Sequence, residues 1–264
     1  MVIDFHTHCF AKRIAGRALD QLIGRSAMRN PLFDGTPAGL QGFLAQNQID
    51  YGVVLNIATN PRQQKAVNDF AISMLGQARL IPFGSVHPDA PDWKEELHRL
   101  KAAGIQGIKF HPDYQDFFVD DKRLWPIYQE VASLGLITSF HAGFDIGIPD
   151  PCHAPPEAMA KALPVFEGAP VIAAHFGGWQ LWEGVKAHLC GKNIYFDTAY
   201  ICRKMPPPWA KELIALHGAE RILLGSDLPW ADPTDEMFFL KCCGLSPSAL
   251  DLVFGGTAAR LLGL

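Results

Sequence analysis

Charged side chains are scarce in this sequence of 264 residues, and they do not gather in basic patches with aromatic residues. Aspartate, glutamate, lysine and arginine together make up 19% of the chain, and 23 basic against 27 acidic residues give a net charge of −4 at pH 7. A nucleic-acid-binding protein needs a basic surface with stacking aromatic side chains. We therefore expect a small-molecule ligand and no nucleic-acid partner.

Patterns typical of exported and membrane proteins are also missing. No apolar stretch reaches the roughly 18 residues of a membrane span, and the first residues lack the basic start and apolar run of a signal peptide. The six cysteines show neither CxxC spacing nor a disulfide framework. These absences predict a protein of the reducing cytoplasm that does not associate with membranes.

Apolar residues, by contrast, are plentiful. They make up 48% of the chain, which is enough to fill a large core and excludes a disordered or fibrous protein. No linker or change of composition divides the sequence, and its proline-rich stretches, 149–156 and 206–208, are short enough to be loops. We predict one domain that spans residues 1–264.

Short apolar runs recur at nearly regular intervals and predict strands. A strand and a helix with their turns need roughly 30 residues, and the runs follow one another at about that interval. The predicted strands are residues 2–5, 51–57, 80–86, 105–110, 136–140, 171–174, 193–196 and 221–224.

Helix signals lie between these runs. Asn60 before Pro61 and Asp92 before Trp93 predict helix starts, and Gly104 and Gly135 predict helix ends. Three more helices are expected at 232–241, 247–254 and 257–262. Strands that alternate with helices imply a parallel sheet, and eight such units favour a closed (β/α)8 TIM barrel. The alternative is an open doubly wound sheet, although no GxGxxG follows the first strand.

The longest interval, residues 9–50, is expected to hold two helices, one of them basic. Its positive charges are Lys12, Arg13, Arg17, Arg25 and Arg29. They predict either a solvated helix face or a lid that attracts an anionic substrate.

Histidines lie where the predicted strands end. His6 and His8 are one residue apart, so both imidazoles face the same side of the first strand. The histidines that end later apolar runs are His87, His111, His141 and His175, and the last run is followed by Asp227. Active sites of (β/α)8 barrels lie at the carboxyl ends of the strands. Because neutral imidazoles and carboxylates are good ligands for divalent cations, we predict a metal site at this rim.

Several motifs resemble those of one enzyme family. They are Asp4-x-His6-x-His8, Phe140-His141, the Ala-His-Phe-Gly-Gly of 174–178 and the Gly-Ser-Asp of 225–227. Together they resemble the amidohydrolase superfamily, and the last two are most similar to its amidohydrolase-2 family of metal-dependent TIM-barrel hydrolases and decarboxylases. The resemblance implies that His6, His8, His141 and Asp227 hold one divalent cation, usually zinc. It also implies that His175 is a catalytic histidine.

The predicted ligands allow two reactions. In a hydrolase, the cation lowers the pKa of bound water towards about 7 and polarises the carbonyl of an ester, lactone or amide, while Asp227 accepts the proton and His175 holds the substrate oxygen. In the decarboxylase alternative, the cation chelates a hydroxy-aromatic acid and Asp227 protonates the ring carbon as CO2 leaves. A third hypothesis is a non-catalytic binding barrel that keeps the metal as a structural staple. We favour the hydrolase, with a small anionic substrate; a homo-oligomer is compatible with the sequence.

Lys109 and His111 face the same side of the fourth predicted strand, where a lysine needs a reason to be buried. Three interpretations stay open for Lys109. It is carboxylated and bridges two metals, in which case His141 and His175 hold the second ion; it binds a substrate carboxylate together with His111; or it forms a structural ion pair. Four tryptophans also follow rim motifs and are candidates for an aromatic pocket: Trp179, Trp182, Trp209 and Trp230.

Overall fold

Eight short strands form the centre of the molecule, and each overlaps one of the predicted strands. The computed structural model describes residues 1–26, 30–148 and 150–264. The strands are β1 (Ile3–Thr7), β2 (Tyr51–Leu55), β3 (Leu80–Phe83), β4 (Gly107–Phe110), β5 (Ile137–Phe140), β6 (Val171–Ala173), β7 (Tyr195–Asp197) and β8 (Ile222–Leu223).

The strands close into a barrel. Hydrogen bonds order them as β1-β2-β3 and as β4-β5-β6-β7-β8, and all neighbours are parallel. Two isolated parallel bridges join the two sheets, one between Gly84 and Ile108 and one between Thr7 and Leu228. The first and last strands are therefore neighbours, which confirms the closed (β/α)8 barrel over the open sheet.

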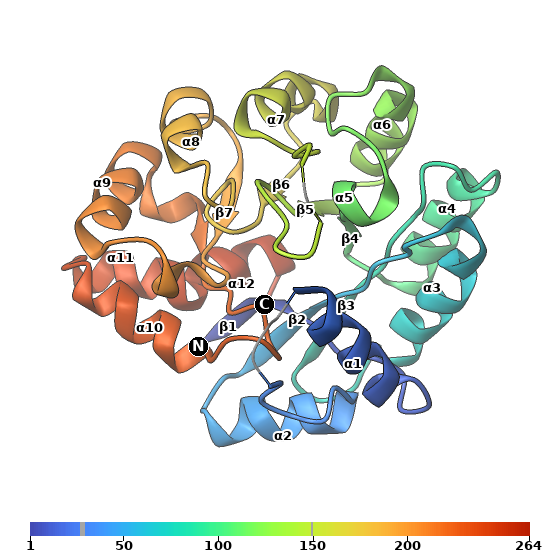
Figure 1. The fold of residues 1–264 in the computed structure, drawn as a ribbon, viewed down its shortest axis with the longest axis horizontal. Coiled ribbons are helices and arrows are strands. Elements are labelled where there is room, and N and C mark those ends of the chain that lie inside the picture. Colours follow the sequence, from blue (N-terminus) through green and yellow to red (C-terminus); the bar gives the residue numbers. More distant parts are fainter. Residues whose placement is uncertain (27–29, 149) are drawn as a thin grey trace.

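Helices surround the strands as an outer ring (Figure 1). The α-helices are α1 (Ala15–Ser26), α2 (Pro37–Gln46), α3 (Gln64–Ser73), α4 (Trp93–Ala103), α5 (Pro112–Gln115), α6 (Trp125–Ser133), α7 (Pro156–Ala162), α8 (Trp182–His188), α9 (Pro207–His217), α10 (Pro233–Cys242), α11 (Pro247–Asp251) and α12 (Thr257–Leu262). Shorter 3-10 turns are η1 (Pro61–Gln63), η2 (Lys122–Leu124), η3 (Leu163–Phe166), η4 (Ile201–Arg203) and η5 (Ala219–Arg221), and η6 (Leu252–Gly256) is a π-helical turn. No helix in the described ranges is both long and apolar enough to cross a membrane.

The predicted helix ends have clear physical causes. Gly104 and Gly135 follow α4 and α6 with φ of +97° and +62°, a conformation that costs glycine little. Asn60 precedes η1, which runs on into α3. Asp92 precedes α4 as predicted, but its carboxylate does not cap that helix. It accepts a hydrogen bond from the Gln64 side chain at 3.0 Å instead, and so ties α4 to α3.

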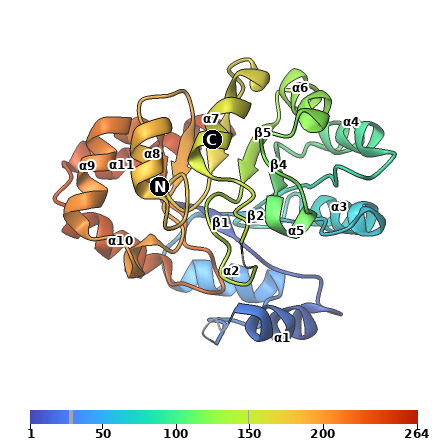
Figure 2. The ribbon, with the colours of Figure 1, turned by 45° about the horizontal axis from the view of Figure 1, so that its top comes forward.

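The barrel interior is filled with apolar side chains and closed at one end. Its cluster comprises Ile3, Phe5, Val53, Leu55, Phe83, Ile137, Ile172 and Leu223 from the strands, with Ala258 and Leu262 from α12. The Gln106 side chain, just before β4, donates to the carbonyl of Leu262 at 3.1 Å, which places α12 at the amino-terminal end of the strands. Figure 2 shows α1 on one side of the strands and the C terminus on the other. The open mouth therefore lies at the carboxyl ends of the strands.

An irregularity in β1 turns its histidines towards this mouth. Ile3 and Phe5 face the interior, so strict alternation would put Thr7 inside and His6 outside. The register with β2 shifts between Asp4 and Thr7, however. Such an irregularity re-aims the side chains that follow it. His6 and His8 consequently face the mouth, while the Thr7 hydroxyl donates to the carbonyl of Val53 at 2.8 Å.

Candidate metal centre

A cavity of about 640 Å³ opens at the carboxyl ends of the strands, and every predicted site residue lines it. These residues are His6, His8, Lys109, His111, His141, His175 and Asp227. Of the four candidate tryptophans, Trp179 and Trp230 line the cavity and the other two do not. The barrel thus brings together residues that are more than 200 positions apart in the sequence.

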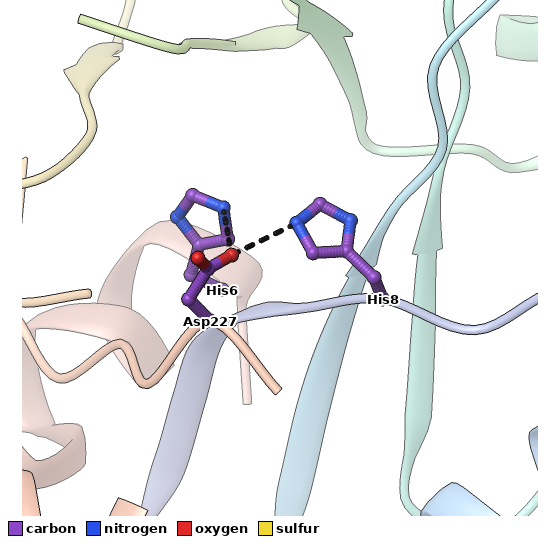
Figure 3. Close-up of side chains that lie close together, drawn as sticks. All are labelled: His6, His8 and Asp227. Atoms are coloured by element: carbon purple, nitrogen blue, oxygen red, sulfur yellow. Dashed lines mark ion pairs between the residues drawn. The ribbon is translucent and has the colours of Figure 1, made fainter. Parts of the chain in front are cut away.

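The first group in this cavity consists of His6, His8 and Asp227. Nδ1 of His6 lies 2.8 Å from a carboxylate oxygen of Asp197, and Nδ1 of His8 lies 2.9 Å from the carbonyl oxygen of Leu55. Both oxygens only accept hydrogen bonds, so in each neutral imidazole the proton is on Nδ1 and Nε2 carries a lone pair. These two Nε2 atoms face Oδ1 of Asp227, at 3.4 Å and 3.2 Å (Figure 3).

This arrangement fits a divalent cation. Three electron-pair donors point at one another with no hydrogen between them, which is repulsive unless a positive charge lies among them. Ligands about 2.0–2.1 Å from a tetrahedral zinc ion are roughly 3.3 Å apart, and the two separations here are close to that value. Burial, followed by the charge of Lys109, holds the pKa of His6 well below its ordinary value, so that its imidazole is in the neutral, ligating form.

His175 and His141 continue the group along the rim. Nδ1 of His175 donates to the carbonyl oxygen of Ala199 at 3.0 Å, which leaves a lone pair on Nε2. That atom lies 3.1 Å from Nδ1 of His141, so His141 donates to it, and Nε2 of His141 keeps a lone pair. Nε2 of His141 is buried and has no hydrogen-bond partner among the described residues. This is the protonation state that a metal ligand requires.

His141 does not lie in the group of His6, His8 and Asp227, however. The structure gathers it into a second possible metal-binding group with His111 and Asp145. Its ring stacks on that of His111, with centroids 4.2 Å apart. His175 lies between the two groups, because its ring centroid is 5.1 Å from that of His6 and 4.8 Å from that of His141. The role of His141 as fourth ligand stays a prediction.

The second group is arranged differently from the first. The backbone N–H of Tyr114 donates to Nδ1 of His111 at 3.3 Å, so in the neutral ring the proton is on Nε2. That N–H faces a carboxylate oxygen of Asp145 at 3.5 Å. His111 therefore presents a donor rather than a lone pair, which suits a carboxylate partner better than a cation.

Lys109 lies inside the barrel, with 1% of its surface exposed. Burial lowers its pKa to about 8, against the opposing effect of the negative charges of Asp197 and Asp227. Nζ has no hydrogen-bond partner and no carboxylate within 4.0 Å among the described residues. The structural ion pair therefore has no partner within this distance in this part of the chain.

Local backbone structure brings β8 and its aspartate up to β1. The Asp4 carboxylate accepts hydrogen bonds from the backbone N–H groups of His6 and Ser226, at 3.1 Å and 3.0 Å. A Cβ on Gly225 would lie 3.0 Å from Cβ of His6, so a larger residue would push the two strands slightly apart. Asp227 has a φ of +73°, a conformation rare outside glycine that concentrates at functional sites.

Sequence reasoning missed two carboxylates of the site. Asp197 ends β7 and is fully buried, and its Oδ1 accepts from the backbone N–H groups of His175 and Ala199 at 3.0 Å and 3.1 Å. The rule applied to the histidines, a polar residue at the carboxyl end of a strand, would have found it. Asp145 lies in the loop after β5, where no periodic pattern marks it.

Only some of the basic side chains in residues 9–50 line the cavity. Arg13 and Arg25 line the cavity, as a lid that attracts anions would require. Lys12 and Arg17 are exposed and do not line it, and Arg29 lies outside the described residues.

The family model described as amidohydrolase matches residues 3–264. The chain belongs to the amidohydrolase family. Amidohydrolases of this family include metal-dependent hydrolases and decarboxylases, so the chain is an enzyme of this class that acts on a small molecule. Among curated proteins, none matches the sequence.

Solved structures with the same fold cover nearly the whole amidohydrolase chain. An uncharacterized TIM-barrel protein from Bordetella bronchiseptica has a TM-score of 0.75 at 18% identity, covering 99% of this chain and 98% of that one. The 5-carboxyvanillate decarboxylase from Sphingomonas paucimobilis has a TM-score of 0.70 at 13% identity, covering 100% of this chain and 99% of that one. A probable 2-pyrone-4,6-dicarboxylic acid hydrolase from Acinetobacter baumannii has a TM-score of 0.67 at 17% identity, covering 100% of this chain and 99% of that one. At these identities the likeness shows the shared barrel.

Proposed function

We propose that this amidohydrolase is a hydrolase in which His6, His8 and Asp227 hold one divalent cation, with His141 as the fourth ligand. Zinc is the first candidate, because two imidazoles and a carboxylate form a typical zinc ligand set. The observation that carries the proposal is the convergence of three lone-pair atoms at separations of 3.2 Å and 3.4 Å. The third hypothesis, a binding barrel without catalysis, is set aside, because the family to which the chain belongs is one of hydrolases and decarboxylases.

When bound, the cation would supply an acidified water and a polarised carbonyl. The chain's own residues would then move the proton. Oδ1 of Asp227 faces the two imidazoles, which leaves its other oxygen to accept a proton and pass it to the leaving group. His175, whose ring the carbonyl of Ala199 fixes in the cavity, would hold the substrate oxygen in its imidazolium form, because Nε2 of the neutral ring carries no hydrogen. Both roles are parts of the proposal.

An anionic substrate suits the charges around the cavity. Lys109, Arg13 and Arg25 line it, and His111 has an Nε2–H donor at the same rim, where it faces Asp145 at 3.5 Å. We propose that Lys109 and His111 together hold a substrate carboxylate. A second cation bridged by a carboxylated Lys109, with His141 and His175 as its ligands, is the alternative assignment.

Decarboxylation is the second candidate function. The 5-carboxyvanillate decarboxylase and a 2,6-dihydroxybenzoate decarboxylase share the barrel over the whole chain, as does the pyrone dicarboxylic acid hydrolase. The acid would then chelate the ion that the same ligands hold, and Asp227 in its protonated form would give its proton to the ring carbon as CO2 leaves. Measuring CO2 release from hydroxy-aromatic acids, beside hydrolysis of ester, lactone and amide panels, separates the two.

Elemental analysis of protein purified without chelators tests the metal centre. We expect about one zinc per chain in the wild type and a loss of metal in the His6→Ala, His8→Ala double variant. Two ions per chain would support the bridged assignment of Lys109. Equal metal content in the wild type and the double variant would show that the ion is bound elsewhere, and the proposal would fail.

Asp227→Asn tests the proton transfer. The variant keeps a side chain of the same shape, so we expect a folded barrel with turnover reduced by a factor of about 10² to 10⁴. Circular dichroism and metal analysis are the controls for folding and loading. Near-normal turnover in a metal-loaded Asp227→Asn variant would refute the role.

The remaining expectations concern the setting of the enzyme. All six cysteines are free, which suits the reducing cytoplasm that we propose as its location. The absence of a nucleic-acid partner and the homo-oligomer stay predictions from the sequence.

A further inference from the structure

The cavity extends well beyond the candidate metal centre, into a slot between α1 and α3. Its volume of about 640 Å³ is in the range of pockets that hold drug-sized ligands, yet the candidate ligands line only one end of it. The apolar part of its lining includes Ile14, Ala18 and Leu22 from α1 and the residue before it, and Val67 and Phe70 from α3.

Apolar side chains from α1 and α3 line this part of the cavity, which we call the α1–α3 slot. Ile14, Ala18 and Leu22 are four residues apart, so they form one stripe along α1 and the residue before it. Ile14 is 47% exposed, and Ile146, from the loop after β5, is 45% exposed at the same cavity. Phe70 also packs on the core, but the other apolar side chains leave part of their surface in the cavity, and such a lining forms a binding surface for an apolar group.

The polar residues of the cavity are distributed unevenly. The imidazoles, Lys109 and Asp227 come from the barrel rim, whereas the polar lining beside α1 and α3 consists of Arg13, Arg25, Gln21, Thr59, Asn60 and Gln63. A compact ring with several carboxylates would leave the slot empty. An acid or ester that carries a long apolar substituent would fill both ends at once.

We propose that the substrate is amphiphilic, with a reacting carboxyl or carbonyl group at the metal centre and an aryl-alkyl or medium-chain alkyl group in the α1–α3 slot. The proposal rests on the proposed function for the position of the reacting group. In this proposal Ala18 and Val67 determine substrate specificity, because they line the slot and do not contact the reacting group.

The test is a calorimetric titration of the zinc-loaded protein with straight-chain carboxylates from acetate to octanoate. Each methylene that enters the slot should tighten binding about fourfold. Ala18 of α1 and Ala66 of α3, next to Val67, both line the cavity, so Ala18→Trp and Ala66→Trp should each fill the slot and abolish this dependence on chain length. Ala102→Trp, on the exposed face of α4, is the matched control and should retain it.

The outcomes separate this proposal from the metal centre. Equal affinity for acetate and octanoate in zinc-loaded protein would overturn the slot. A chain-length dependence that survives in both slot variants would overturn it too, because the apolar group would then bind elsewhere. Protein that binds no zinc but shows the dependence, and loses it in the slot variants, would support the slot and refute the metal proposal.

Discussion

Replacing Asp197 by asparagine removes the carboxylate that fixes the tautomer of His6. The native oxygen lies 2.8 Å from Nδ1 of His6 and keeps the proton there, so that Nε2 is bare. The asparagine amide can keep an oxygen for the backbone N–H groups of His175 and Ala199, but it then presents an NH2 group to His6. The imidazole would move its proton to Nε2 to accept from that group, and Nε2 would no longer be a ligand.

The size of the expected loss of zinc affinity can be taken from carboxylates that orient metal-ligating histidines in other proteins. Carboxylates that orient a ligating histidine are typically worth 10- to 100-fold in metal affinity, or about 1.4–2.7 kcal/mol. Because Asp197 is fully buried and its hydrogen bond is short, we expect a loss near the upper end. The barrel should stay folded, because the replacement preserves shape and the two backbone hydrogen bonds.

Competition with a chromophoric chelator measures the zinc affinity directly. The exposed Asp251→Asn substitution, which makes the same chemical change at the end of α11, is the control and should leave affinity unchanged. If Asp197→Asn bound zinc within threefold of the wild type, the tautomer argument would be wrong, and with it the reason given for the convergence of bare nitrogens.

Two further predictions concern stability. Burial lowers the pKa of His217 to about 4, and its ring bridges the N–H of Gly191 and the carbonyl of Ile194 in the neutral form. The unfolded chain takes up this proton below about pH 6.5, so the free energy of unfolding should fall by up to about 3 kcal/mol between pH 6.5 and 4, and His217→Gln should remove that part of the slope in urea titrations. Gly143→Ala should cost at least about 2 kcal/mol, since φ is +83° and a Cβ would lie 2.0 Å from the backbone nitrogen of Trp179, whereas Gly16→Ala, with open space around it, should be neutral or slightly stabilising in the same assay.

The fold could be predicted because its signals are local. Apolar runs, glycine helix ends and the repeat of strand and helix are each visible within a short window of sequence, and eight parallel units in one chain close into a barrel. Closure then predicts that residues 6 and 227 meet, because the first and last strands become neighbours. The lengths of the strands depend on hydrogen bonds across the sheet, and these were predicted less well.

The candidate site was predictable only in part, because its protonation states are set by distant backbone atoms. The carbonyls of Leu55 and Ala199 decide which nitrogen of His8 and His175 carries the proton, and neither can be inferred from a motif. The face of His6 depends on the register shift in β1, which no alternation rule would give. The position of Asp145 in the site depends on the course of the loop after β5, which the sequence pattern does not predict.

The apolar plug formed by α12 has a kinetic consequence. In the described part of the chain, the interior is blocked beneath the polar rim, so substrate and product share one doorway. The product must dissociate before the next substrate molecule can bind, so product and substrate compete for the free enzyme. Accumulating product should therefore slow turnover in a way that more substrate overcomes.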